Sequence, residues 1–162
     1  MTTETASALE TRYLPKGRRL GSVHREILHY INSGETALFR FLRGYLNAAS
    51  LWTSRDDNEE YLDATHTIED IAIASLVSAW AECSQFCREC ATDLTHLDDE
   101  RNGHDFWLTR NHHGSYWDEP VNDELAEFAM QQLTRASESY GEVDLHIGDD
   151  RKLHFSNERS FI

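Results

Sequence analysis

The apolar positions in the first part of the chain recur every three or four residues, which is the repeat of an amphipathic helix. They predict helices over residues 22–31, 35–51 and 73–94. The stripe expected to face the core in the second helix consists of Leu38, Leu42, Tyr45, Ala49 and Trp52. Residues 54–66 have no such repeat and many acids, so they predict a loop between the second and third helices.

Beyond the third helix the repeat shortens to about two residues, which is typical of a β-strand. Phe106 and Leu108 occupy alternate positions, and residues 111–114 read Asn-His-His-Gly, a composition suited to a hairpin turn. We therefore expect a β-hairpin over residues 104–118, in which residues 115–117 form the returning strand.

A fourth helix is predicted over residues 118–140. Asp118 can cap its start, Pro120 suits its first turn, and Gly141 can end it. Its apolar side consists of Val121, Leu125, Phe128, Ala129, Leu133, Ala136 and Tyr140. Residues 143–155 then alternate again on both sides of a Gly-Asp-Asp-Arg turn, and they predict a second hairpin.

Together these elements predict an α+β fold. A helical N-terminal half would pack on a small antiparallel sheet, which a C-terminal ββαββ unit supplies. Residues 1–21 predict a flexible basic arm, because four basic residues surround Pro15 and Gly17. Residues 22–162 predict a single α+β domain, which suits the length of the chain.

The charge of the chain changes this picture by suggesting a class of partner. Its formal net charge is −14, with +3 in residues 1–50 and −17 in residues 51–162. Such a surface repels nucleic acid and attracts basic proteins, so direct DNA or RNA binding is disfavoured. The alternative interpretation is that the acids serve only solubility. No apolar run is long enough to cross a membrane, and the N-terminus does not resemble a secretion signal, so we expect the cytoplasm.

Three cysteines and several histidines raise the question of a metal or a catalytic site. Cys83, Cys87 and Cys90 have the spacing of an iron–sulfur motif, but they lie on the apolar stripe of the third helix, so we expect reduced, buried thiols. Zinc held by His104, His113 and Asp118 is the alternative. The sequence contains neither a phosphate-binding glycine loop nor a nucleophile elbow. We therefore predict no metal, no cofactor and no catalytic residue.

Four stretches of the chain resemble a family of small acidic proteins encoded by bacteriophages and mobile elements. They are FLRGYLNAASLWTSRDDNEEYLDATHTIEDI, ECSQF, GHDFWLTRNHHGSYWD and YGEVDLHIGDDRKLHF, all within residues 41–155. The family carries glycine where this chain has His112 and Arg151, and it lacks the extra Cys87 and Cys90. The resemblance brings no established activity. It implies a gene carried by a phage or plasmid, whose product acts inside a bacterial host.

The aromatic residues of the predicted hairpin allow two interpretations. Trp107, Trp117 and Arg110 are residue types that dominate protein–protein contacts. Alternatively, the two tryptophans brace each other across the hairpin and serve only the fold. A site at residues 104–118 that uses Arg110, Asn111 and His113 would instead indicate a small enzyme or a nucleotide-binding protein.

The favoured hypothesis is an accessory protein that binds and inhibits a host defence or DNA-processing protein. The partner would offer a basic nucleic-acid-binding surface, which acids of this chain would occupy by mimicking DNA. These acids would come from two loops and the fourth helix. The residues predicted to bind the partner are Asp56, Asp57, Glu59, Glu60, Asp63, Asp98, Asp99, Glu100, Trp107, Arg110, His113 and Trp117.

Overall fold

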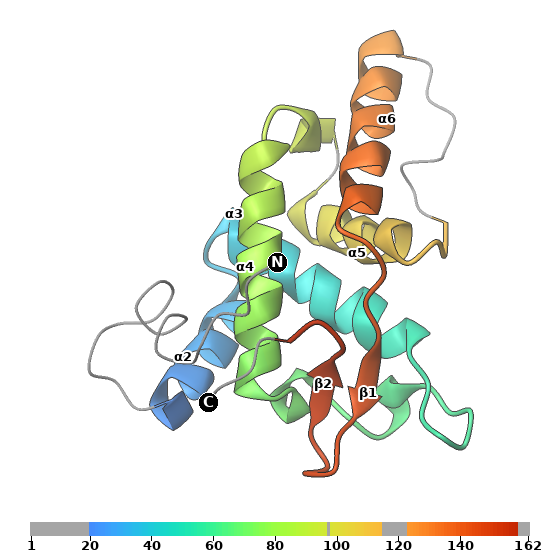
Figure 1. Ribbon diagram of the computed structural model, residues 1–162. Coiled ribbons are helices and arrows are strands. Elements are labelled where there is room, and N and C mark those ends of the chain that lie inside the picture. Colours follow the sequence, from blue (N-terminus) through green and yellow to red (C-terminus); the bar gives the residue numbers. More distant parts are fainter. Residues whose placement is uncertain (1–19, 97, 115–122, 159–162) are drawn as a thin grey trace.

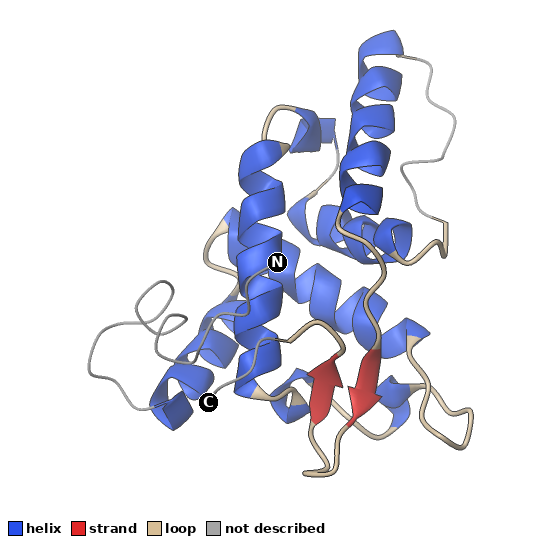
Figure 2. Ribbon diagram, in the orientation of Figure 1, coloured by secondary structure: helices blue, strands red, loops and turns tan. Residues whose placement is uncertain are grey.

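The computed structural model describes residues 20–96, 98–114 and 123–158, and its ribbon is shown in Figure 1. Its longer helices are α2 (Leu20–Ser33), α3 (Ala37–Arg43), the π-helix η1 (Gly44–Leu51), α4 (Ile73–Glu89), α5 (Asp99–Arg110) and α6 (Glu124–Ser139). Three 3-10 turns, η2 (Leu62–Ala64), η3 (Ile68–Asp70) and η4 (Asp93–His96), and two strands, β1 (Leu145–Ile147) and β2 (Leu153–Phe155), complete the described part. This is a helix-dominated α+β fold, as Figure 2 shows.

Helix α4 is largely buried, and elements from both halves of the chain pack against it. Leu76, Val77, Cys83 and Phe86 all lie in the core on this helix. Helices α2 and α3 contact it, and so does β2, which lies near its N-terminal end in Figure 1. The start at residue 73 agrees with the prediction. The helix ends at Glu89, one turn earlier than expected, because the chain tightens into η4.

Helices α3 and η1 cross α5 at a close approach to which each side contributes a glycine. A Cβ atom on Gly44 would lie 1.9 Å from the carbonyl oxygen of Glu100, and one on Gly103 would lie 1.9 Å from that of Phe41. Only glycine permits backbones to approach so closely. The RGY and NGH triplets therefore mark a helix crossing.

The first predicted hairpin is wrong, because residues 104–110 belong to α5. Asp98 caps this helix by accepting a hydrogen bond from the Arg101 backbone N–H at 2.8 Å. Phe106, Trp107 and Arg110 are all buried, and the spacing between these positions is that of one face of a helix. An alternation over so few residues does not distinguish a strand from a buried helix. The ββαββ unit is accordingly not confirmed, and Trp107 lies in a helix. Trp117, its expected partner across the hairpin, lies outside the described residues.

The second hairpin is confirmed. Strands β1 and β2 pair antiparallel, with Leu145 opposite Phe155 and Ile147 opposite Leu153. The alternation predicted the side chains that face inward, since Leu145, Leu153 and Phe155 are buried. Leu153 also bridges to Ile71, which joins the small sheet to the segment preceding α4.

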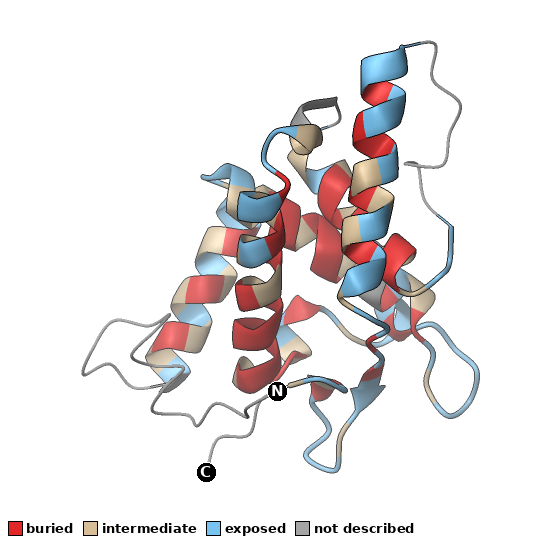
Figure 3. Ribbon diagram, turned by 45° about the horizontal axis from the view of Figure 1, so that its top comes forward, coloured by how far each residue is buried: buried red, intermediate tan, exposed pale blue. Residues whose placement is uncertain are grey.

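Two apolar stripes that the helical repeat predicted to be buried, in the second and fourth predicted helices, are only partly buried. Trp52 is 56% exposed while Leu51 is 3% exposed. The π-helix η1 explains this difference, because its wider turns rotate the following residues relative to an α-helix. In α6, Leu125 and Phe128 are 77% and 59% exposed, and Figure 3 shows the exposed side of this helix.

The ends of the predicted elements shift in other places. Helix α6 starts at Glu124 and Asp123 caps it, whereas Asp118, the predicted cap, lies outside the described residues. It ends before Gly141, whose φ of 77° is the conformation expected of a C-terminal glycine. Of the predicted basic arm, residues 1–19 lie outside the described part, and α2 begins at Leu20.

Candidate partner-binding surface

Arg110 connects three helices in the interior of the protein. Its Nη1 donates to Glu82 Oε2 of α4 at 3.1 Å and to Tyr45 Oη of η1 at 3.2 Å. Its Nε and Nη2 donate to the carbonyl oxygens of Gly141 and Tyr140, at 2.8 and 3.1 Å. Burial disfavours the charged form, yet the contacts with Tyr45 and Glu82 raise the pKa of Arg110, so it stays protonated. The guanidinium therefore fixes where the chain leaves α6.

Asn111 completes this arrangement. Its side-chain nitrogen donates to the Trp107 carbonyl at 3.0 Å, and its side-chain oxygen accepts from the Val143 backbone N–H at 2.9 Å. Arg110 and Asn111 thus direct their polar groups to other parts of the protein. His113 is exposed. This geometry gives no support to a nucleotide or catalytic site built from Arg110, Asn111 and His113.

The segment 141–144 separates two surface hollows that share Glu142 and Val143. The first hollow measures about 630 Å³ and is lined by Ser78, Glu82, Gln85, Glu89, Arg110, Ser139, Tyr140, Glu142, Val143 and Asn157. The second measures about 550 Å³ and is lined by Thr53, Ser54, Arg55, Trp107, Asn111, His113, Glu142, Val143, Asp144 and Ser156. The segment is extended and alternates, so Val143 is buried whereas Glu142 and Asp144 are exposed.

The first hollow is rich in carboxylates. Glu82 accepts from Arg110 and also from Asn157 Nδ2 at 2.6 Å. Glu89 accepts from two neutral donors, Gln85 Nε2 at 2.8 Å and Tyr140 Oη at 3.3 Å. Burial, followed by the charge of Glu89, raises the pKa of Tyr140, which agrees with a negative potential in this hollow.

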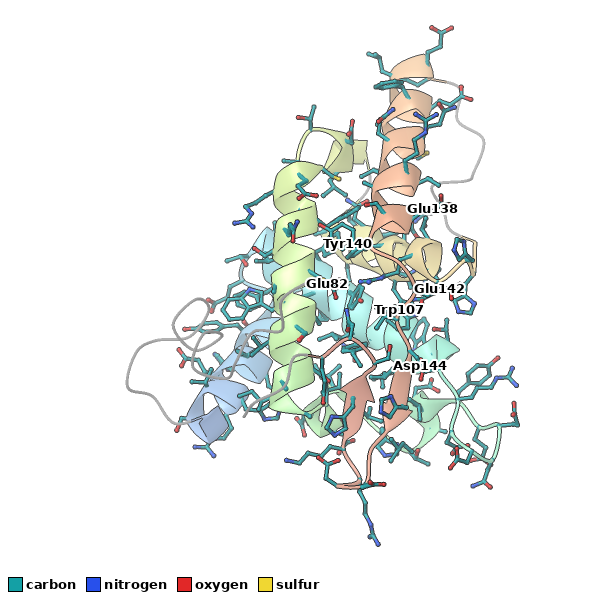
Figure 4. The ribbon with its side chains drawn as sticks, viewed as in Figure 1. Glu82, Trp107, Glu138, Tyr140, Glu142 and Asp144 are labelled. Carbon is teal, nitrogen blue, oxygen red and sulfur yellow. The ribbon has the colours of Figure 1, made fainter. Side chains whose placement is uncertain are left out.

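Carboxylates continue along the surface beyond the first hollow. We name Glu82, Glu89, Glu138, Glu142 and Asp144 the acidic band; four of them are labelled in Figure 4. Within the part of the chain that the structure describes, no lysine or arginine forms an ion pair with Glu138, Glu142 or Asp144. Two exposed histidines lie near two of these acids, since His112 lies 3.8 Å from Glu142 and His146 lies 3.8 Å from Asp144.

The predicted acids at residues 98–100 serve the fold. Asp98 is the cap of α5 described above. Asp99 pairs with Arg40 at 2.8 Å, and Glu100 pairs with Arg43 at 2.9 Å. These two ion pairs join the start of α5 to α3, so their charges are compensated within the protein.

The predicted acids at residues 56–63 lie in a structured loop next to the second hollow. Asp56 Oδ1 accepts from the backbone N–H groups of Asn58 and Glu60, at 2.8 and 3.0 Å, which shapes the turn. The other four acids of the loop are exposed: Asp57, Glu59, Glu60 and Asp63. Because Arg55 lines the second hollow together with Asp144, the loop adjoins the acidic band.

The remaining predicted residues divide into interior and exposed positions. Trp107 is 2% exposed and donates from Nε1 to Thr53 Oγ1 at 2.7 Å. Arg110 is 1% exposed, so both side chains belong to the core and not to a contact surface. His113 is exposed beside the second hollow, and Trp117 lies outside the described residues.

Sequence reasoning missed Glu82, Glu89, Glu142 and Asp144 as site residues. Nothing in the repeat of α4 marks its two glutamates. By contrast, the alternation of acid and apolar residues in Glu142-Val143-Asp144-Leu145 was a usable signal, because an extended segment with an apolar inner side must present its acids to solvent.

The three cysteines are free thiols, and Cys83 and Cys90 are buried. Burial, followed by neighbouring negative charge, raises the pKa of Cys87 to about 12 and that of Cys90 to about 11. Both are therefore protonated thiols near neutral pH, which makes them poor nucleophiles. Among the described residues, no group of three or more His, Cys, Asp or Glu side chains is arranged to hold a metal ion.

No family model matches the sequence, and comparison with curated proteins and with solved structures finds no match either. In the described ranges, none of the helices has the length and apolar character needed to cross a membrane.

Proposed function

We propose that this protein is a non-catalytic binding protein whose acidic band engages a lysine- and arginine-rich surface of another protein. The observation that carries the proposal is the position of Glu138, Glu142 and Asp144. They are exposed, they follow one another from the end of α6 to the start of β1, and no described lysine or arginine neutralises them. A basic partner supplies the missing counter-charge and is drawn to the band by its field.

The resemblance to phage and mobile-element proteins suggests who the partner is. In that setting, the protein is an accessory factor that inhibits a host nucleic-acid-binding protein, such as a restriction or CRISPR effector. It does so by occupying the basic groove that normally takes nucleic acid. The acidic band forms the centre of the contact, and the exposed acids of the 57–63 loop extend it past the second hollow.

The experiment compares two variants that lose the same charge from different places. Glu138→Gln with Glu142→Gln removes two carboxylates from the band, whereas Glu35→Gln with Glu69→Gln removes two exposed carboxylates elsewhere. Purified restriction and CRISPR effectors are the probes, and the readouts are the association rate and the displacement of bound DNA. Protein and DNA should compete, and association should slow as salt is raised.

The band variant should associate several-fold more slowly, with an unchanged melting temperature, while the control should stay within about twofold of the wild type. If the association rate falls by the same factor in both variants, the charge of the whole chain and not the band is responsible. If no effector in the panel releases its DNA, the proposed inhibition is wrong.

A further inference from the structure

The first two turns of α6 expose two large apolar side chains. Leu125 is 77% exposed and Phe128 is 59% exposed. In Figure 1 this end of α6 extends past the end of α4, and in Figure 3 its outer side is exposed. Ala126, Ala129 and Met130, on the opposite side of the same turns, already attach the helix to the body.

Other exposed aromatic side chains have partners within the protein. Trp52 packs edge-on against His104, with ring centroids 6.5 Å apart. Tyr61 lies under the Arg55 guanidinium at 4.6 Å and also accepts a hydrogen bond from it. Leu125 and Phe128 differ from these, because they are three residues apart on one helix and form a continuous apolar surface.

This apolar surface is confined to the end of the helix. The stripe that begins with Leu125 and Phe128 continues with three polar residues at the same spacing, namely Gln132, Arg135 and Ser139. Asp123, Glu124 and Glu127 are exposed in the same two turns. We name these five residues, Asp123, Glu124, Leu125, Glu127 and Phe128, the α6 tip. Apolar side chains surrounded by acids form a typical small recognition site.

The charges of the tip decide which kind of partner fits it. Its three acids have no basic residue among them, and the nearest arginine along the helix is Arg135, two turns away. Two copies of the chain that joined tip to tip would bring six carboxylates together, and like charges so placed repel each other. A complementary segment instead carries apolar side chains flanked by lysine or arginine.

We infer that the α6 tip anchors an amphipathic basic segment of the protein that the acidic band engages. This inference rests on the proposed function and adds the apolar contact to it. One face of α6 connects the tip to the band. Along it, Glu124, Glu127, Gln131 and Glu138 follow one another at spacings of three, four and seven residues, and all four are exposed. A helical segment laid along α6 contacts the tip with its apolar side and the band with its basic side.

Two synthetic peptides of equal length and equal lysine content test the inference on the full chain. One carries leucine at positions spaced three and four apart, and the other carries serine there. The wild type should bind the leucine peptide at least tenfold more tightly than the serine peptide. Leu125→Ser with Phe128→Ser should abolish this preference, while the control Ile147→Ser, at another exposed apolar position, should keep it.

Three other outcomes would overturn the inference. The first is equal affinity of the wild type for both peptides, or a preference that survives in the tip variant. The second is a dimer in sedimentation velocity that the tip variant abolishes, because the tip would then bind a second copy. The third is a tip variant that melts several degrees lower, because the pair would then pack against the chain itself.

The test also separates this inference from the proposed function. Glu138→Gln with Glu142→Gln should weaken binding of both peptides equally and leave the leucine preference unchanged. If that band variant binds both peptides as tightly as the wild type, the acidic band fails as a binding surface while the anchor at the tip stands.

Discussion

The guanidinium of Arg110 is buried in the middle of the protein, where a charge is costly unless it is fully paired. It has four acceptors, which belong to η1, α4 and the chain that leaves α6. The same side chain lies over the rings of Phe106 and Tyr140, at 5.4 and 5.7 Å from their centroids. A residue type that usually marks a contact surface is here part of the core, and burial alone reveals the difference.

Replacing Arg110 with methionine should lower the free energy of unfolding by about 3–5 kcal/mol, because the partly buried Glu82 loses its charged partner and two backbone carbonyls lose a donor. Chemical denaturation measures this loss. Adding Glu82→Met to the same chain should recover part of it, since the uncompensated carboxylate is then removed as well. A loss below about 1 kcal/mol for the single variant would contradict the interior role of Arg110.

His112 and Arg151 have left-handed backbone angles, although neither is glycine. The φ angle is 57° at His112 and 67° at Arg151. Residues other than glycine adopt this region at a cost of roughly 1–2 kcal/mol. His112→Gly and Arg151→Gly should therefore each raise the free energy of unfolding by about 0.5–1 kcal/mol, after the greater freedom of glycine in the unfolded chain is subtracted.

The neighbouring substitution His113→Gly is the control, because His113 has no positive φ. It should leave stability unchanged or lower it slightly. Thermal and denaturant unfolding of the three variants measure the effect, and equal changes at residues 112 and 113 would show that the backbone angle is not the cause.

At the scale of elements, the crossing of α3 and η1 with α5 depends on two glycines that lie within helices. Glycine within a helix normally lowers its stability by about 0.5–1 kcal/mol relative to alanine. Gly103 is retained in this chain where any side chain would meet the Phe41 carbonyl oxygen. The packing of two helices, and not the local preference of one, explains the residue.

Gly103→Ala should consequently lower the free energy of unfolding by several kcal/mol, because backbone atoms must move apart and the packing of Phe106 and Trp107 moves with them. The rough scale is about 3 kcal/mol, as for other overpacked cores. Gly21→Ala in α2 is the matched control, since a Cβ there meets nothing within 4 Å. It should raise stability by about 0.5–1 kcal/mol. The same sign for both variants in denaturant unfolding would contradict the close crossing.

At the scale of the whole molecule, the C-terminal hairpin is held to the helices by a chain of polar contacts centred on His154. Its Nε2 lies 2.9 Å from Asp150 Oδ1, and its Nδ1 lies 2.9 Å from Glu158. Ser75 of α4 donates to Glu158 and accepts from the Phe155 backbone N–H at 2.9 Å. An imidazole with a carboxylate at each nitrogen thus completes the connection between sheet and helix.

This arrangement predicts a stability that depends on pH. Partial burial disfavours the charged imidazole, but the hydrogen bonds with Asp150 and Glu158 outweigh it and raise the pKa of His154 above its ordinary 6.5. The stabilisation is therefore complete below about pH 6.5 and is lost as pH rises through the higher pKa of the folded state. Unfolding measured across this window should show the loss in the wild type.

His154→Gln is the comparison, because it keeps a polar side chain and removes the titration. The difference in stability between wild type and variant should shrink as pH rises. His146 lies on the same hairpin and its ring stacks on that of His154 at 6.1 Å, so His146→Gln serves as a second control that should preserve the loss. A difference that grows with pH would show that the imidazole is neutral in the folded protein.

Much of the fold could be predicted because its cause is local. The start of α4, the end of α6 and the second hairpin follow from apolar repeats, a C-terminal glycine and turn residues, all of which act within a few positions. The net charge and the exposed acids of the 57–63 loop are likewise properties of the sequence. The alternation that exposes Glu142 and Asp144 is also a property of the sequence.

The tertiary structure decided where local preference was weak or where distant residues meet. Residues 104–110 are helical because Gly103 packs on Phe41 and because Arg110 finds acceptors on three other segments. Asp99 and Glu100 are neutralised by Arg40 and Arg43, nearly 60 residues away in the chain. Burial and pairing are long-range properties, so the packed chain alone separates the acids that hold the fold from those that stay exposed at the surface.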